Sequence, residues 1–283
     1  MEAYDRRNHQ SPPRHRVVDR RGNRVRHRLL HLLRLLHRSL KGHTLKITLI
    51  AATKTFDNNI AKALGFSRLD VLVDDIDHLA ETAGRLCYMS FHRPNEKTAQ
   101  NHDYLANVIS QGHESVLAHG SMTLLAEGVS RSLTHELIRS RFLAFSELSQ
   151  RYVNMCDYHT VIPPAAEGDS EAEEIIREAH EYAREAYERL VKRFEDRGLS
   201  RKQAREAARC VLPGGVETKI IVSGNMRAWR DFIRQRLTPH ADAEMQRFAY
   251  WAYHYAYKVA PGTMGDLREL ADDFEKRFPK YTI

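Results

Sequence analysis

The sequence has little cysteine and no long apolar run, and each absence excludes a class of protein. The three cysteines, Cys87, Cys156 and Cys210, lie far apart and form no Cys-x-x-Cys pair. They provide neither a disulfide framework nor a zinc site, and they favour a reducing cytoplasm. No apolar run approaches the roughly 20 residues that a membrane-spanning helix needs. A composition of 42% hydrophobic and 29% charged residues is typical of a soluble globular protein.

A glycine-rich phosphate-binding loop is also missing. Neither G-x-G-x-x-G nor G-x-x-x-x-G-K-[ST] occurs, and Gly214-Gly215 stands alone after Pro213, as in a simple turn. A bound dinucleotide would therefore have to be held by arginines and by the N-termini of helices.

Positive charge is concentrated at the start of the chain. Residues 1–43 contain twelve lysines and arginines against three carboxylates, which gives +9 and leaves −2 of the total +7 for residues 44–283. We predict a basic, disordered extension over 1–43 and a folded domain over 44–283. The leucine-rich part of the extension is either a short basic helix for anionic membranes or nucleic acid, or an inert segment. The near-neutral body gives no support to nucleic-acid binding.

The body shows both strand and helix patterns. Alternating apolar residues predict strands at 45–50, 121–125 and 217–223. Helices are predicted at 74–88, 95–109, 130–141, 171–194 and 241–259, with another that carries Trp229, Phe232 and Ile233. Asn95, Ser130 and Asn225 are the expected N-caps. We therefore predict an α+β fold: one helix-rich domain with a mixed or antiparallel sheet.

Residues 133–153 contain the densest group of potential ligand-binding side chains. Three arginines, Arg139, Arg141 and Arg151, share this stretch with serines and with the carboxylates of Glu136 and Glu147. Each guanidinium presents a planar fork of donors that binds phosphate or carboxylate at two points. The pattern indicates a site for an anionic, planar ligand such as a nucleotide.

Other arginines allow two interpretations. Arg227, Arg230 and Arg234 recur at spacings of three and four, so they share a helix face. That face is either an anion site or a solvated surface with ion pairs four residues apart. Arg209 lies among apolar neighbours and needs an anionic partner, from the protein or from a ligand.

Two further motifs carry weaker signals. His113 and His119 flank Glu114, but a spacing of six residues is poor for two ligands on one helix, and we predict no metal site. Ser149 lacks the G-x-S-x-G elbow of a hydrolase nucleophile, which favours a binding role.

Taken together, these blocks resemble the flavin-dependent thymidylate synthases. That family is marked by Arg-His-Arg, seven residues and then Ser, and Arg139-Ser140-Arg141 followed by Ser149 matches the spacing and three of the four named positions. Further similar segments occur in the family's order at 83–88, 112–117, 208–213, 224–229 and 240–242. The resemblance covers roughly residues 46–270.

The resemblance implies a fold, a reaction and partners. It implies an α+β homotetramer whose active sites are shared between subunits. It implies FAD as cofactor, NADPH as reductant and methylenetetrahydrofolate as one-carbon donor. The implied reaction is reductive methylation of dUMP at uracil C5 to dTMP, without a protein nucleophile.

The resemblance also assigns roles to residues. Arg236 is implied as the catalytic residue, because a fixed cation beside the pyrimidine stabilises negative charge on the ring. Contacts to the substrate nucleotide are implied for Glu136, Arg139, Glu147, Leu148, Ser149, Gln150, Arg151, Arg209 and Arg236. Contacts to FAD are implied for Ser115, Arg139, Ser140, Arg141, Asn225, Arg227 and Asp231, and proximity to flavin or folate for His113 and His240.

Two positions depart from the family pattern. Ser140 replaces the central histidine of the motif, and a hydroxyl has neither a flat face nor a titration near neutral pH. Ala118 stands where relatives usually carry Glu. Three alternatives remain open: the dUMP methylase, a UMP C5-methylase of specialised nucleoside biosynthesis, and a nucleotide-binding paralogue without turnover.

Overall fold

A computed structural model describes residues 45–55, 74–91 and 96–281 of the 283-residue chain. The chain divides into two compact units, Met1–Gly42 and His43–Ile283, and all described residues belong to the second. The predicted basic extension and the expected cap Asn95 lie outside the described residues. The proposed boundary after residue 43 therefore stays a prediction.

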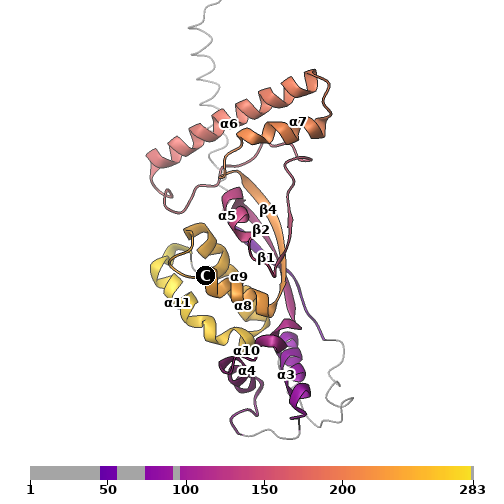
Figure 1. The fold of residues 1–283 in the computed structure, drawn as a ribbon. Coiled ribbons are helices and arrows are strands. Elements are labelled where there is room, and N and C mark those ends of the chain that lie inside the picture. The colour runs from indigo at the N-terminus through magenta and orange to yellow at the C-terminus, as the bar shows by residue number, and fades with distance from the viewer. Residues whose placement is uncertain (1–44, 56–73, 92–95, 282–283) are drawn as a thin grey trace, which may run out of the picture. The chain divides into compact units, whose positions relative to one another are not determined.

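Four antiparallel strands form the sheet that the described residues contain (Figure 1). Their order is β1-β2-β4-β3, with β1 at Lys46–Ala52, β2 at Ser121–Ser130, β4 at Glu217–Asn225 and β3 at Ala144–Glu147. The register pairs Leu124 with Val222 and Phe145 with Val222 on either side of β4. The predicted α+β fold class is confirmed, and the sheet is antiparallel.

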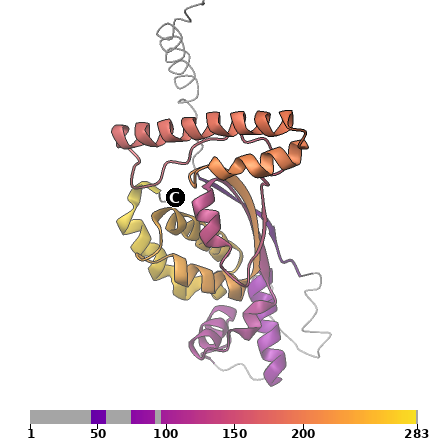
Figure 2. The same ribbon diagram turned by 45° about the horizontal axis from the view of Figure 1, so that its top comes forward.

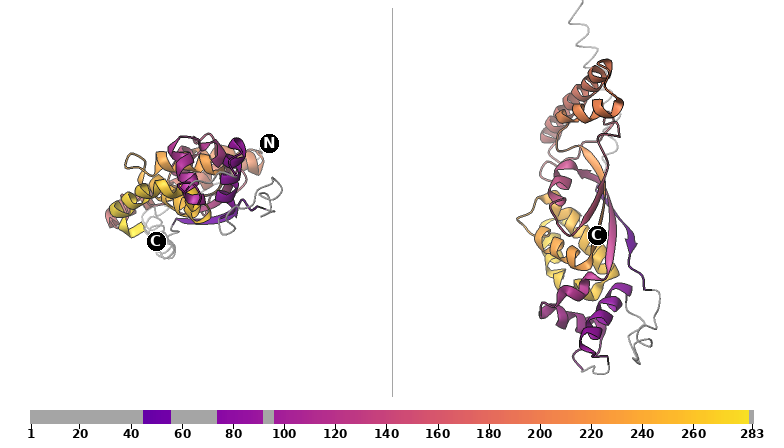
Figure 3. Two further views of the ribbon diagram at one scale, coloured as in Figure 1. Left: turned by 90° about the horizontal axis from the view of Figure 1, so that it is seen from below. Right: turned by 45° about the vertical axis from the view of Figure 1, so that its right-hand side comes forward.

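Helices account for most of the remaining described residues (Figures 1 and 2). The longer ones are α3 Asp75–Tyr88, α4 Asn101–Ser110, α6 Ser170–Asp196, α8 Met226–Arg236, α9 Ala243–Val259 and α11 Arg268–Arg277. The shorter ones are η1 Glu114–Ala118, α5 Arg131–Leu137, α7 Arg201–Ala208, η2 Arg209–Val211, α10 Pro261–Met264, η3 Gly265–Leu267 and η4 Pro279–Tyr281. Helices α6 and α7 pack side by side, as the turned views also show (Figure 3).

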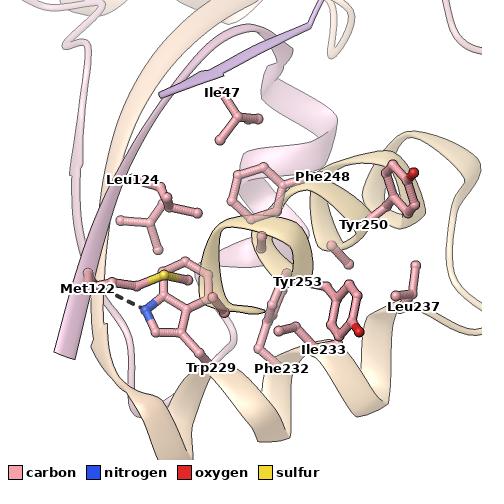
Figure 4. Packing of buried hydrophobic residues seen from close by; sticks show 14 of the residues in the cluster. Ile47, Met122, Leu124, Trp229, Phe232, Ile233, Leu237, Phe248, Tyr250 and Tyr253 are labelled. Atoms are coloured by element: carbon pink, nitrogen blue, oxygen red, sulfur yellow. Dashed lines mark hydrogen bonds between the residues drawn. The ribbon is translucent and has the colours of Figure 1, made fainter. Parts of the chain in front are cut away.

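The main core lies between one face of the sheet and helices α8 and α9 (Figure 4). Alternating residues of β2, such as Met122 and Leu124, point into it because successive side chains of a strand face opposite ways. Trp229 is fully buried there and donates its indole N–H to the carbonyl of Met122 at 3.2 Å. This packing fixes α8 against the sheet, and α8 carries several of the predicted site residues.

A smaller core joins α3 and α4 to η1. Tyr104, Leu105 and Leu117 are buried in it. Gly84 of α3 faces the Tyr104 side chain so closely that a Cβ atom would collide with the hydroxyl. A glycine at this position therefore lets the two helices approach, and it brings α3 beside the segment that contains His113.

Most predicted elements form near their predicted places, with a few corrections. The helix capped by Ser130 ends at Leu137, short of the predicted Arg141, because the N–H groups of Arg139 and Ser140 bond only three residues back. Helix α9 starts at Ala243 after the extended residue Asp242, two residues later than predicted. Helix α4 starts at Asn101, six residues later than the predicted 95, because residues 96–100 form turns and a bend and Gln100 takes the N-cap position. The elements β3, α7, α10 and α11 have no counterpart among the predicted ones.

Candidate functional site

Helix α5 is the local framework of the site (Figure 1). It starts where predicted, since the Ser130 hydroxyl accepts the Leu133 N–H at 3.0 Å. Glu244 of α9 fixes that cap by accepting the N–H and the hydroxyl of Ser130, at 2.8 and 2.6 Å. After α5 the chain turns through residues 138–143 into β3. The short helix thus presents charged residues at both of its ends.

A pocket of about 240 Å³ lies beside the strip that follows α5. We call it the RSR pocket. Its lining residues are Arg139, Ser140, Arg141, Phe142, Leu143, Ala228, Asp231, Phe232 and Gln235. Four of the predicted cofactor contacts, Arg139, Ser140, Arg141 and Asp231, therefore come together here.

A second pocket, of about 270 Å³, lies between α3, α4 and the start of α8. We call it the His113 pocket. Its lining residues are Gly84, Cys87, Tyr88, Tyr104, Val108, Gly112, His113, Ser115, Val116 and Arg227. The His113 ring stacks on Tyr88, with ring centroids 6.3 Å apart. Three other predicted contacts, His113, Ser115 and Arg227, meet in this pocket rather than in the RSR pocket.

Several predicted arginines are without a carboxylate partner. Within residues 45–55, 74–91 and 96–281, the guanidinium groups of Arg139, Arg141, Arg209 and Arg227 make no ion pair. All four side chains are exposed. Their donors are therefore available to an anionic ligand.

The N-terminal end of α5 holds a pair of cations. Arg131 lies 3.0 Å from Glu147 and donates to the carbonyl of Leu148, while Glu147 also accepts the Thr134 hydroxyl at 2.7 Å. Burial lowers the pKa of Arg131, and the nearby positive charge of Arg209 lowers it further. A phosphate between these two arginines would relieve their repulsion. Arg209 is among the predicted substrate contacts, whereas Arg131 is not among the predicted site residues.

The C-terminal end of α5 holds the predicted catalytic arginine. Arg236, from the end of α8, donates a short hydrogen bond to Glu136. Its Nε group is buried and finds no acceptor among the described residues. Two residues assigned to the nucleotide site, 100 positions apart in the sequence, thus meet.

The remaining predicted substrate residues follow β3 in a turn. The Ser149 carbonyl accepts the N–H groups of Tyr152 and Val153, at 3.2 and 3.0 Å. Arg151 is exposed and lies 3.8 Å from Glu206 of α7. Ser149 and Gln150 are half-buried. Of the two pockets described here, the RSR pocket is lined by Arg139, and neither is lined by Arg151, Arg209 or Arg236.

An ion-pair network fixes α8 relative to η1. Glu114 lies 2.6 Å from Arg234 and 3.5 Å from Arg230, and these contacts hold the pKa of Glu114 below its usual value. Arg230 is completely buried and makes a bidentate pair with Asp266 at 2.7 and 2.8 Å. Arg230 and Arg234 are therefore held by carboxylates from other elements, and because Arg230 is buried, this helix face is neither a solvated surface with ion pairs four residues apart nor a free anion site. Arg227 alone points to the His113 pocket.

Asn225 and His240 lie at opposite ends of α8. The Asn225 side-chain oxygen caps the helix by accepting the Ala228 N–H at 2.9 Å, as predicted. Its amide N–H₂ remains available as a donor. His240 is exposed in the loop between α8 and α9.

The chemical types in the two pockets fit an anionic, aromatic cofactor such as FAD. The RSR pocket combines two unpaired guanidinium groups, a hydroxyl, two aromatic rings and the carboxylate of Asp231, which lies 3.8 Å from Arg234, and the His113 pocket adds another unpaired arginine. Arginines attract the pyrophosphate, and aromatic rings stack on flat ring systems. In the described part of the chain, no group of three or more His, Cys, Asp or Glu side chains could hold a metal ion. No helix there is long and apolar enough to cross a membrane.

Comparison with known families gives a clear match. The model of the family described as "Thymidylate synthase complementing protein" matches residues 70–262. That span includes both pockets and both ends of α5.

Curated relatives cover most of the chain. The chain is 47% identical to the flavin-dependent thymidylate synthase of Mycobacteroides abscessus over 206 residues, 70% of this chain and 82% of the relative. It is 46% identical to that of Mycobacterium marinum over 211 residues, 71% of this chain and 84% of the relative. It is also 46% identical to that of Mycobacterium tuberculosis over 206 residues. The chain therefore belongs to the flavin-dependent thymidylate synthase family, and the predicted family of enzymes is confirmed.

Proposed function

We propose that the protein methylates dUMP at uracil C5 to give dTMP. FAD is the cofactor, NADPH the reductant and methylenetetrahydrofolate the one-carbon donor. The observation that carries the proposal is the arrangement of cations around α5. Arg131 and Arg209 mark one end, and Arg236 with Glu136 marks the other. Arg131 and Glu136 are five positions apart in the helix, a rise of about 8 Å, which suits a nucleotide with its phosphate at one end and its base at the other.

Each end of α5 has a chemical task in this proposal. Arg131 and Arg209 bind the phosphate, and the bond of Glu147 to Arg131 keeps that guanidinium in place. Arg236 faces the pyrimidine, and Glu136 orients it. A fixed cation at the base stabilises negative charge that develops on the ring. The residues of the two pockets bind the flavin, which supplies the hydride chemistry of the reaction.

We also propose that the active site is shared between copies of the chain in a homotetramer. Seven of the nine predicted flavin or folate contacts divide between two pockets, four in the RSR pocket and three in the His113 pocket, whereas Asn225 and His240 line neither. Large apolar side chains of the sheet, such as Ile50 and Ile221, are exposed in the single chain. Both observations support assembly, because exposed apolar groups favour subunit contacts. The free thiols of Cys87, Cys156 and Cys210 support a cytoplasmic location.

The test is a methylation assay with dUMP and UMP side by side. The purified full chain receives FAD, NADPH and labelled methylenetetrahydrofolate, and C5 methylation of each nucleotide is measured. We expect label in dTMP and much less in the UMP product. Label in the UMP product alone would support the alternative UMP C5-methylase. FAD and dUMP binding without any methylation would support the paralogue without turnover.

A further inference from the structure

Phe142 is the most exposed of the large hydrophobic side chains that the structure describes, at 75%. It belongs to the turn that leads from α5 into β3. The Leu143 N–H bonds to the Ser140 carbonyl at 3.3 Å, so Arg141 and Phe142 are the two central residues of this turn. Both side chains are exposed and both line the RSR pocket.

The fold holds this turn in place from both sides. Leu137 before the turn is completely buried, and Leu143 after it is 8% exposed in the main core. Leu143 occupies the space beside Gly224 of β4, where a Cβ atom would collide with it. The exposure of Phe142 is therefore a consequence of anchored backbone on either side, and the ring is presented at the pocket before any ligand binds.

The pocket around Phe142 has the chemistry of a site for a flat, anionic ligand. Arg139 and Arg141 have no carboxylate partner among the described residues. Ser140 offers a hydroxyl and no planar surface. Of the two aromatic rings that line the pocket, Phe232 is 3% exposed and packs in the core. Phe142 is therefore the ring with a free face.

We propose that Phe142 stacks on the isoalloxazine ring of the bound flavin. The inference rests on the proposed function. The position of the pocket favours the isoalloxazine ring of FAD over its adenine ring. Arg139 lines the pocket, and its N–H bonds at 3.2 Å to the carbonyl of Glu136, whose carboxylate accepts a hydrogen bond from Arg236, the residue proposed to face the pyrimidine. The redox-active ring of the cofactor has to lie near the pyrimidine, whereas its adenine does not. Phe142 is thus a cofactor-binding residue.

The experiment uses two substitutions of Phe142 and two matched controls. Phe142→Leu keeps an apolar side chain and removes the flat face, so we expect the Kd for FAD to rise about ten-fold. Phe142→Trp brings an indole into contact with the isoalloxazine, and electron transfer from the indole should quench the fluorescence of the bound flavin. Tyr182 of α6 is equally exposed, at 74%, and lies outside both pockets. Tyr182→Leu and Tyr182→Trp should leave FAD affinity and bound-flavin fluorescence as in the wild type.

The outcomes separate this inference from the proposed function. If the wild-type protein binds no FAD, the proposed function fails first. If it binds FAD, and Phe142→Leu keeps wild-type affinity while Phe142→Trp shows no added quenching, the stacking inference is overturned. A second result would also overturn the stacking inference. If the FAD-free Phe142→Leu protein changes its oligomeric state while Phe142→Trp keeps wild-type flavin fluorescence, the Phe142 ring belongs to a subunit contact.

Discussion

At the scale of single residues, the arginines of the site fall into two groups. Arg131, Arg151 and Arg236 face the carboxylates of Glu147, Glu206 and Glu136. Arg139, Arg141, Arg209 and Arg227 have no such partner in the described part of the chain. The unpaired arginines are free to bind phosphates, whereas a paired arginine is held in one orientation. The pairing of Arg236 suits a catalytic group that must meet the pyrimidine ring in a fixed position.

The first prediction concerns Arg236. Arg236→Ala should lower kcat for methylation by about 10²- to 10³-fold, because a charge-stabilising donor at the reacting ring is lost. It should change the free energy of unfolding by no more than about 1 kcal/mol, since the ion pair is partly exposed. Steady-state kinetics and thermal denaturation measure the two effects.

The control for Arg236 is Arg247, which pairs with Glu167 at 2.7 Å and has comparable exposure. Arg247→Ala should lose a similar ion pair and keep wild-type kcat. Normal turnover in Arg236→Ala, or an equal loss in both variants, would remove Arg236 from the catalytic role.

Sequence alone predicts site roles for most of these residues but cannot show which of them are paired. The strip 139–151 and Arg236 were predicted from local motifs and from family resemblance. The partners Glu136 and Arg236 are 100 positions apart, so only the folded chain shows that they meet. Arg131 was missed because nothing near it in the sequence signals a ligand. Its importance comes from the fold, which brings Arg209 close to it.

At the scale of elements, the position of α8 depends on the Glu114 network. Glu114 belongs to η1, Arg230 and Arg234 to α8, and Asp266 to η3. These ion pairs join three segments of the chain, and the side chain of Arg230 within them is completely buried. His113 and Ser115 flank Glu114, so the same network sets the geometry of the His113 pocket.

The second prediction follows from the lowered pKa of Glu114. The hydrogen bond from Arg234 is the main cause, and it holds the pKa below the ordinary 4.5. A carboxyl with a depressed pKa in the folded state stabilises the fold above its unfolded pKa, and that stability is lost as the pH falls through the folded value. At pH near 7, Glu114→Gln should therefore cost about 1 to 3 kcal/mol of unfolding free energy.

Denaturant unfolding at several pH values measures this effect. The difference between wild type and Glu114→Gln should shrink as the pH falls below 4.5. Glu127→Gln, at a more exposed pair with Lys219, should show a smaller difference at neutral pH. A difference for Glu114→Gln that is independent of pH would contradict the electrostatic explanation.

The third prediction uses the two functions of Asn225. Its side-chain oxygen caps α8, and the family resemblance implies that the residue also contacts FAD. Asn225→Asp keeps an acceptor at a helix N-terminus and should preserve the melting temperature, but it removes the donor and adds a negative charge near FAD. Asn225→Ala should lose about 1 kcal/mol of stability as well as FAD affinity. Equal FAD affinity in wild type and Asn225→Asp would show that the residue is only a cap.

The elements themselves were largely predictable where local chemistry determines them. The caps at Ser130 and Asn225 were predicted because a short polar side chain before an apolar helix pattern has few other roles. Strand β3 was not predicted because it has only four residues and its sequence is like that of an ordinary loop. It forms because it pairs with β4. The early end of α5 was missed because the arginine-rich strip has good intrinsic helix propensity, and tertiary contacts of Leu143 override it.

At the scale of the whole molecule, the proposed site requires more than one copy of the chain. The fourth prediction is that two inactive variants restore each other. Arg227→Ala disables the His113 pocket and Arg141→Ala the RSR pocket. If each flavin contacts the His113 pocket of one subunit and the RSR pocket of its neighbour, random mixed assemblies contain intact sites at about one quarter of positions.

The two variants are unfolded together, refolded as a mixture and assayed for dTMP formation. Each variant refolded alone is the control and should stay inactive. Recovery toward a quarter of wild-type activity is expected from the mixture. Mixed tetramers without recovered activity would mean that each site lies within one chain.

The most direct test of the account is a titration of dUMP into the FAD-bound protein, followed by the flavin absorption spectrum. We predict that dUMP perturbs the spectrum, because nucleotide and flavin share one site. In Arg209→Ala, we expect FAD to bind as in the wild type and the Kd for dUMP to rise about 100-fold, because a charge-assisted phosphate contact is lost. Two results would contradict the proposal that nucleotide and flavin share one site with Arg209 at the phosphate. One is a flavin spectrum that dUMP leaves unchanged at any concentration, and the other is an Arg209→Ala titration identical to that of the wild type.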